Sequence, residues 1–187
     1  MNGESREKKS KYAIVKSAKE CAYLAVFVAL VIAGQVLLSA LPSVEIVTVM
    51  FVGYSFVFGV KRGMLAATAF SLLRQFVFGV YPTVLILYLL YFNGLAAVFG
   101  GLGRRVKKPL KNLWWIVLLA CVCSASFTLM DNILTPLWYG YSARVTKMYF
   151  TASLPIMITQ VVCTAVSVGA LFVPLEKTFQ LAKKGLR

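Results

Sequence analysis

The chain is built from long apolar runs that short polar segments separate. A helix rises about 1.5 Å per residue, so roughly 20 mostly apolar residues are needed to cross about 30 Å of bilayer hydrocarbon. Six runs approach that length, and together they take up most of the chain. The pattern therefore predicts an all-α membrane protein, a six-helix transmembrane bundle. The predicted spans are residues 20–41, 44–60, 63–80, 82–101, 113–135 and 148–173.

A short glycine-containing sequence recurs near the ends of three predicted spans. FVFGV occurs at 56–60 and again at 76–80, and VFGG follows at 98–101. Glycine tolerates the backbone conformations that end helices. We interpret Gly59, Gly79 and Gly100 as helix-end residues and not as marks of a domain repeat.

Composition agrees with a membrane solvent. Of the 187 residues, 60% are hydrophobic and 14% are charged, whereas about a quarter of a soluble domain is charged. The first apolar run has span length and no small-residue cleavage site, so we expect it to be a retained helix and not a signal peptide.

The net charge of +14 reflects topology and does not indicate a nucleic-acid partner. With the N-terminus in the cytoplasm, all Lys and Arg residues except Arg74, Arg144 and Lys147 fall on the cytoplasmic side of the six spans. The positive-inside rule then predicts that both termini are cytoplasmic. We expect a basic cytoplasmic N-terminal segment at 1–19, a transmembrane domain at 20–175 and a basic cytoplasmic tail at 176–187.

Aromatic residues are placed as interfacial anchors at both ends of the predicted bundle. Trp114 and Trp115 follow a basic loop, at the inner headgroup level, and Trp138 lies at the outer level, where amphipathic rings prefer to be. Residues 136–147 form the one long outer connection of this prediction. We expect that this connection can act as a lid.

Charged and amide groups inside the apolar runs define one predicted layer near the outer end of the bundle. A charge within the bilayer costs a few kcal/mol even on lenient scales, so it normally faces protein or a wet cavity. Arg74 lies about 9 Å below the outer end of the third span by helical rise. The residues predicted at this level come from four helices and are Gln35, Glu45, Arg74, Gln75, Asp131 and Asn132.

Three explanations of this layer stay open on the sequence alone. Arg74 can extend its side chain to the outer interface, or it can form a structural ion pair with Glu45 or Asp131. The layer can instead line an outward-facing solute site. Four polar or aromatic residues lie deeper in the predicted spans: Tyr88, Tyr91, Asn93 and Gln160. They either form the floor of that cavity or bond neighbouring helices together.

Catalytic and metal chemistry have few candidates in this chain. It has no histidine, and its four cysteines lie within or at the edge of spans. Cys121 and Cys123 point about 200° apart on a helix, which is poor for shared ligation. No nucleophile–base set and no phosphate-binding loop is found. We therefore expect neither an enzyme nor a bound metal or cofactor, and any ATP hydrolysis must come from another chain.

The first span carries a ladder of small residues. Ala25, Ala29 and Ala33 repeat at every fourth position, so they share one helix face. Such a face lets the backbone of another helix approach closely, either within the protein or on a partner.

With these features, the chain resembles the substrate-binding S components of energy-coupling factor (ECF) transporters, the bacterial vitamin importers. The resemblance covers nearly the whole chain: six spans, a basic N-terminus, the ladder that begins with Ala25 and Ala29, LPSVEIVT at 41–48 and FGVKRGMLAA at 58–67. It implies a multi-pass protein of the bacterial plasma membrane. It also implies that Ala25, Ala29 and, by extension, Ala33 contact the transmembrane coupling subunit.

The function that this resemblance implies is capture of a vitamin or related micronutrient on the extracellular side. The coupling subunit and ATPase subunits would be the partners, together with the lipid bilayer and the vitamin-like substrate, whose identity stays open. The alternative is a self-sufficient secondary carrier or channel for a small solute. Such a carrier needs an ion-coupling group, for which Glu45 and Asp131 are the candidates.

Overall fold

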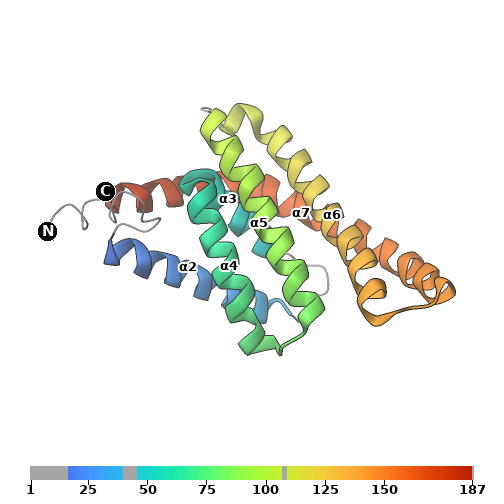
Figure 1. Cartoon of the computed structure of the whole chain (residues 1–187). Helices are drawn as coiled ribbons and strands as arrows, with labels where there is room; N and C mark the ends of the chain where they lie inside the picture. Colours follow the sequence, from blue (N-terminus) through green and yellow to red (C-terminus); the bar gives the residue numbers. More distant parts are fainter. Residues whose placement is uncertain (1–16, 40–45, 107–108, 187) are drawn as a thin grey trace, which may run out of the picture.

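The structure, a computed structural model, describes residues 17–39, 46–106 and 109–186, and its regular secondary structure is entirely helical (Figure 1). Each α-helix overlaps one predicted span, which confirms the all-α fold class. The helices are α2 (Ala18–Leu37), α3 (Ile46–Phe58), α4 (Val60–Phe78), α5 (Pro82–Arg105), α6 (Leu113–Tyr139) and α7 (Ala143–Gly185), with a 3-10 helix, η1 (Pro109–Asn112), before α6.

Four helical segments are long and apolar enough to cross a membrane: Ala18–Leu37, Pro82–Arg105, Pro109–Tyr139 and Ala143–Gly185. The helix α3 is apolar but has only 13 residues, about 20 Å of helical rise. The helix α4 has 19 residues and carries three cationic side chains. The chain is thus a helical protein whose four long apolar segments indicate a multi-pass membrane protein.

The short helix α3 is the centre of the fold. From Val47 to Phe58 every side chain except that of Met50 is buried, because α3 packs against α2, α4, α5 and α7. A helix that is apolar on all sides needs such an environment. The hydrophobic run at 46–58 is therefore explained by protein packing on every side.

Aromatic rings join the other helices to α3. The Phe27 ring of α2 stacks on the Tyr54 ring with centroids 4.1 Å apart, and Phe179 of α7 meets Phe27 edge-on at 5.8 Å. The Phe51 ring of α3 also lies 4.9 Å from that of Phe92 in α5. Such pairs add about 0.5–1.5 kcal/mol each to the burial of their surface, so this cluster is a principal source of the packing.

The glycine predictions are confirmed at two positions and wrong at one. Gly59, with φ of 85°, separates α3 from α4, and Gly79, with φ of 93°, ends α4. Gly100 does not end a helix, because α5 continues to Arg105. A Cβ at Gly100 would lie 2.5 Å from the backbone nitrogen of Val60. Glycine there allows the backbone of α5 to approach the α3–α4 turn.

One end of the helix bundle collects the basic residues, and we call it the basic end. There Arg62 at the start of α4 forms an ion pair with Glu20 at the start of α2, with an N–O distance of 2.7 Å. At the same end, the Lys183 ammonium near the end of α7 donates to the carbonyl of Val57 near the end of α3. The starts of α2 and α4 therefore lie with the ends of α3 and α7.

The helix α7 is much longer than the predicted sixth span. Its 43 residues extend over about 64 Å of helical rise, and the part of the α6–α7 pair drawn in orange extends away from α2–α5 (Figure 1). The tail predicted at 176–187 is helical to Gly185. It also contributes Glu176 and Phe179 to the buried interior.

The predicted long loop at 136–147, and with it the predicted lid, is wrong. Residues up to Tyr139 belong to α6, and α7 begins at Ala143. Gly140 ends α6 in the left-handed conformation, and the Ser142 side chain caps α7 by accepting a hydrogen bond from the Val145 N–H at 3.4 Å. These two caps shorten the connection to a tight turn.

Candidate functional site

A polar cluster of Gln35, Arg74 and Tyr88, which we call the Arg74 cluster, joins three helices at the end opposite the basic end. The Arg74 Nε donates to the Gln35 side-chain oxygen at 3.1 Å, and the Gln35 amide donates to the Tyr88 hydroxyl at 3.1 Å. The three residues come from α2, α4 and α5. The sequence placed Gln35 and Arg74 at one depth, and the structure brings them into contact.

Aromatic rings cover the Arg74 guanidinium. Its Cζ lies 4.3 Å from the Tyr88 ring centroid and 4.6 Å from that of Phe78. Such cation–π contacts are worth about 0.5–2 kcal/mol, more where water is excluded. The half-buried Arg74 is therefore held within the protein. Its terminal NH2 groups make no hydrogen bond to the part of the chain that the structure describes, so they are chemically suited to an anionic group.

Gln75 and Tyr91 are buried beside the Arg74 cluster but have packing roles. Gln75 accepts a hydrogen bond from the Tyr81 backbone at 3.3 Å and so stabilises the α4–α5 turn. The Tyr91 ring packs edge-on against Phe127 of α6, with centroids 4.8 Å apart. Within the described residues the Gln75 side-chain nitrogen is buried without a hydrogen-bond partner.

Asn93 is a link between α4 and α5. Its side chain is 3.3 Å from the Thr68 hydroxyl and donates to the Leu89 carbonyl at 2.8 Å. These bonds match the helix-bonding alternative of the sequence analysis, because both groups of the amide have protein partners.

A second set of polar residues forms a ladder between α6 and α7, which we call the α6–α7 ladder. The Thr128 hydroxyl donates to Gln160 at 2.8 Å, and the Asn132 amide donates to Ser153 at 2.6 Å. In two further hydrogen bonds, the Thr164 hydroxyl donates to that of Ser124 at 3.0 Å and the Tyr149 hydroxyl donates to Asp131 at 2.7 Å. The sequence analysis missed Ser124, Thr128, Tyr149, Ser153 and Thr164, although Ser124, Thr128 and Asn132 show a spacing of four.

The single polar layer predicted from the sequence is thus two separate groups. Asp131 accepts hydrogen bonds from Thr135 and Tyr149, and within the described residues it forms no ion pair with Arg74. The alternative of an Arg74–Asp131 ion pair is therefore wrong, because Asp131 bonds to residues of α6 and α7 whereas Arg74 bonds to Gln35 of α2. Glu45, the other predicted partner, lies outside the described residues.

The alanine ladder of α2 faces away from the rest of the protein. Ala25, Ala29 and Ala33 are exposed, whereas Phe27 and Val28 of the same helix are buried against the core. Internal packing, one of the two explanations for the ladder, therefore does not account for it.

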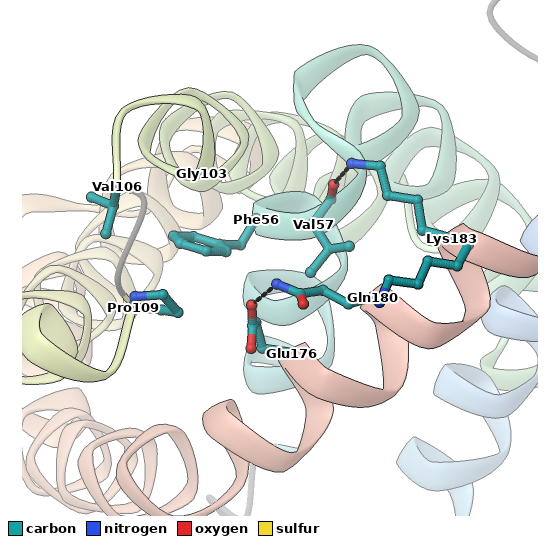
Figure 2. Close-up of a pocket in the computed structure, with 9 residues that line it drawn as sticks. Phe56, Val57, Gly103, Val106, Pro109, Glu176, Gln180 and Lys183 are labelled. Carbon is teal, nitrogen blue, oxygen red and sulfur yellow. Dashed lines mark hydrogen bonds between the residues drawn. The ribbon is translucent and has the colours of Figure 1, made fainter. Parts of the chain in front are cut away.

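A cavity at the basic end contains a carboxylate that the sequence analysis missed. Its volume is about 290 Å³, and Phe56, Gly103 and Glu176 are among the residues that line it (Figure 2). Glu176 is only 5% exposed and accepts a hydrogen bond from the Gln180 amide. The available signal was spacing, because Glu176 follows Phe172 by four residues on the buried face of α7.

The described residues contain no group of three or more His, Cys, Asp or Glu side chains that could hold a metal ion. The Arg74 cluster therefore offers cationic and hydrogen-bonding recognition, and the cavity at the basic end offers one buried carboxylate.

Comparison of the chain with family models, curated proteins and solved structures finds no match in any of the three.

Proposed function

We propose that this protein is the substrate-capturing membrane subunit of an ECF-type importer of the bacterial plasma membrane. In this proposal all six helices cross the membrane, with both termini and the basic end in the cytoplasm. A vitamin or related micronutrient binds at the opposite, extracellular end and passes inward through a coupling subunit driven by ATPase subunits.

The observation that carries the proposal is the Arg74 cluster. A guanidinium is costly within a membrane protein. Here residues of three helices hold the Arg74 guanidinium against two aromatic rings, and its terminal NH2 groups remain as donors for a ligand. Planar guanidinium donors suit carboxylate or phosphate groups, and aromatic rings suit a flat solute. The cluster therefore supports a flat, anionic micronutrient as the substrate.

The exposed alanine ladder supports the partner. A face of small side chains permits close helix contact in a membrane, and Ala25, Ala29 and Ala33 present that face outward. A coupling subunit that docks on α2 would cover this exposed face.

The test is purification of the full chain in lipid nanodiscs, followed by mass spectrometry of co-purified small molecules and of co-purified chains. The proposal expects one tightly held organic anion, together with a coupling subunit and ATPases when the chain is isolated from its native membrane. Purified protein that holds no solute and recovers no ATPase would overturn the proposal.

Glu176 favours a second candidate, a self-sufficient secondary carrier. A buried carboxylate in a cavity is the type of group that such a carrier needs for proton or cation coupling, and Glu176 lies in one. Proteoliposomes that contain only this chain separate the two functions. Gradient-driven solute accumulation that Glu176→Gln abolishes supports the carrier, and tight binding without transport supports the capture subunit.

A further inference from the structure

A second cavity lies in the groove between the start of α6 and the middle of α7. Its volume is about 640 Å³, and it is lined on the α6 side by Lys111, Trp114, Val117 and Cys121, and on the α7 side by Ala165 and Gly169. Neither the Arg74 cluster nor Glu176 contributes to it. This α6–α7 groove is therefore separate from the site of the proposed function.

Small residues of α7, Ala165 and Gly169, leave the groove open beside α6. The two helices contact each other through a buried face that includes Ala120 of α6 and Val168 of α7. Beside that face, a Cβ built on Gly169 would meet no atom within 4 Å. The floor of the groove thus has room for a Cβ at position 169 without displacement of protein atoms.

Polarity is divided along the groove. Its body is apolar, with Val117 and the 47%-exposed Leu118 on helical segment 109–139, one of those apolar enough to cross a membrane. The end of the groove at the start of α6 carries the exposed Lys111 and the 60%-exposed Trp114. The exposed Arg104 and Arg105 end the neighbouring helix α5. Cationic and indole groups over an apolar body match the headgroup boundary of a bilayer.

We propose that the α6–α7 groove binds one anionic phospholipid, with an acyl chain along Gly169 and the phosphate at Lys111. An apolar body that faces the hydrocarbon excludes a water-soluble ligand, and charge complementarity at Lys111 selects an anionic headgroup over a zwitterionic one. Basic pockets between membrane helices on the cytoplasmic side commonly bind acidic lipids in this manner. The inference does not need the importer activity, but it rests on the membrane orientation of the proposed function, with the basic end in the cytoplasm.

The test is lipid retention by the full chain. Protein is incorporated into nanodiscs with equal amounts of phosphatidylglycerol and phosphatidylcholine of the same acyl chains, and native mass spectrometry measures the lipids that stay bound after release. We expect phosphatidylglycerol to be retained over phosphatidylcholine by about five-fold for each basic residue that contacts it. Equal retention of the two lipids would overturn the proposal.

Paired variants locate the lipid. Gly169→Leu places a bulky side chain in the groove and should abolish the retained phosphatidylglycerol. Gly94→Leu adds the same side chain at an exposed position of α5 where a Cβ likewise meets no atom within 4 Å, and it should retain the lipid. Lys111→Gln should remove the preference for phosphatidylglycerol, whereas Lys61→Gln, at an exposed lysine of α4, should keep it. Wild-type retention by Gly169→Leu would contradict the assignment.

If Gly169→Leu fails to fold, tryptophan quenching tests the proposal without a variant at position 169. With Trp115 and Trp138 replaced by Phe, Trp114 is the remaining tryptophan, and brominated acyl chains quench a nearby indole. Brominated phosphatidylglycerol should quench Trp114 more than brominated phosphatidylcholine at equal content. Equal quenching would show that the groove does not select the anionic lipid.

Discussion

Arg74 and Tyr88 are in direct contact across α4 and α5, with the guanidinium carbon 4.3 Å from the ring centroid. The Tyr88 hydroxyl also accepts a hydrogen bond from Gln35, the residue that accepts one from Arg74. The three side chains therefore support one another, and a change in one of them shifts the others. This mutual support makes the cluster suitable for precise placement of a cation.

Arg74→Gln should weaken binding of the co-purified solute by at least about ten-fold. The reason is that hydrogen bonds to a charged group are worth about 1.5–3 kcal/mol, and one factor of ten corresponds to about 1.4 kcal/mol. The measurement is the dissociation constant of the solute by isothermal titration in detergent.

Arg144→Gln is the matched control for Arg74→Gln. Arg144 is exposed near the start of α7, at the end of the bundle that also holds Arg74 in the predicted topology. It should bind the solute as the wild type does. An unchanged dissociation constant in Arg74→Gln would show that the Arg74 cluster is only structural.

Gly103→Ala should destabilise the fold. A Cβ at Gly103 would lie 2.0 Å from the carbonyl oxygen of Phe56, so α5 and α3 must separate. Overpacking of this kind costs about 1–3 kcal/mol, occasionally more. The measurement is the free energy of unfolding in detergent micelles.

Gly101→Ala serves as the control, since a Cβ at Gly101 meets no atom within 4 Å. It should leave the free energy of unfolding unchanged or raise it by up to about 1 kcal/mol through helix propensity. If the two alanine variants were equally stable, the close contact of α5 with α3 would not exist.

The fold class could be predicted from the sequence because the apolar runs are long and uninterrupted. A run of about 20 apolar residues has few alternatives to a helix, and each predicted span overlaps a helix. The limits of α7 could not be predicted in this way. The polar residues of 176–185 resemble a solvated tail, but Phe179 packs on Phe27 and Tyr54, which shows that this segment belongs to the core.

The sequence predicted the level of the site residues along their helices, but it did not predict which residues they contact. Counting residues from a helix end gives the level of a side chain, which placed Gln35 and Arg74 at one depth, and the two side chains are in contact. It does not give the direction in which the side chain points, and Asp131 at a similar predicted level faces Tyr149 of α7 instead. Helix rotation and neighbour choice depend on the tertiary packing, which the chain pattern alone does not determine.

The α6–α7 ladder should be measurable as pairwise coupling. Thr128→Val and Gln160→Leu each remove one side of the 2.8 Å hydrogen bond, so a double-mutant cycle isolates that bond. Interhelical hydrogen bonds in membrane proteins average about 0.6 kcal/mol, and we expect a coupling energy of that size in the free energy of unfolding.

A pair without contact serves as the control for this cycle. Thr128 and Asn93 have separate partners, so Thr128→Val and Asn93→Leu should combine additively. Equal coupling energies in the two cycles would mean that the Thr128–Gln160 hydrogen bond makes no specific contribution.

Ala29→Leu should abolish capture of the coupling subunit without loss of stability. Ala29 is exposed on α2, so the larger side chain does not disturb the interior, but it prevents the close approach of a partner helix. The measurement is recovery of coupling and ATPase subunits from native membranes. Ala97→Leu adds the same side chain at an exposed position of α5 and should recover the partners fully. Full recovery by Ala29→Leu as well would show that the partner does not dock on the alanine ladder.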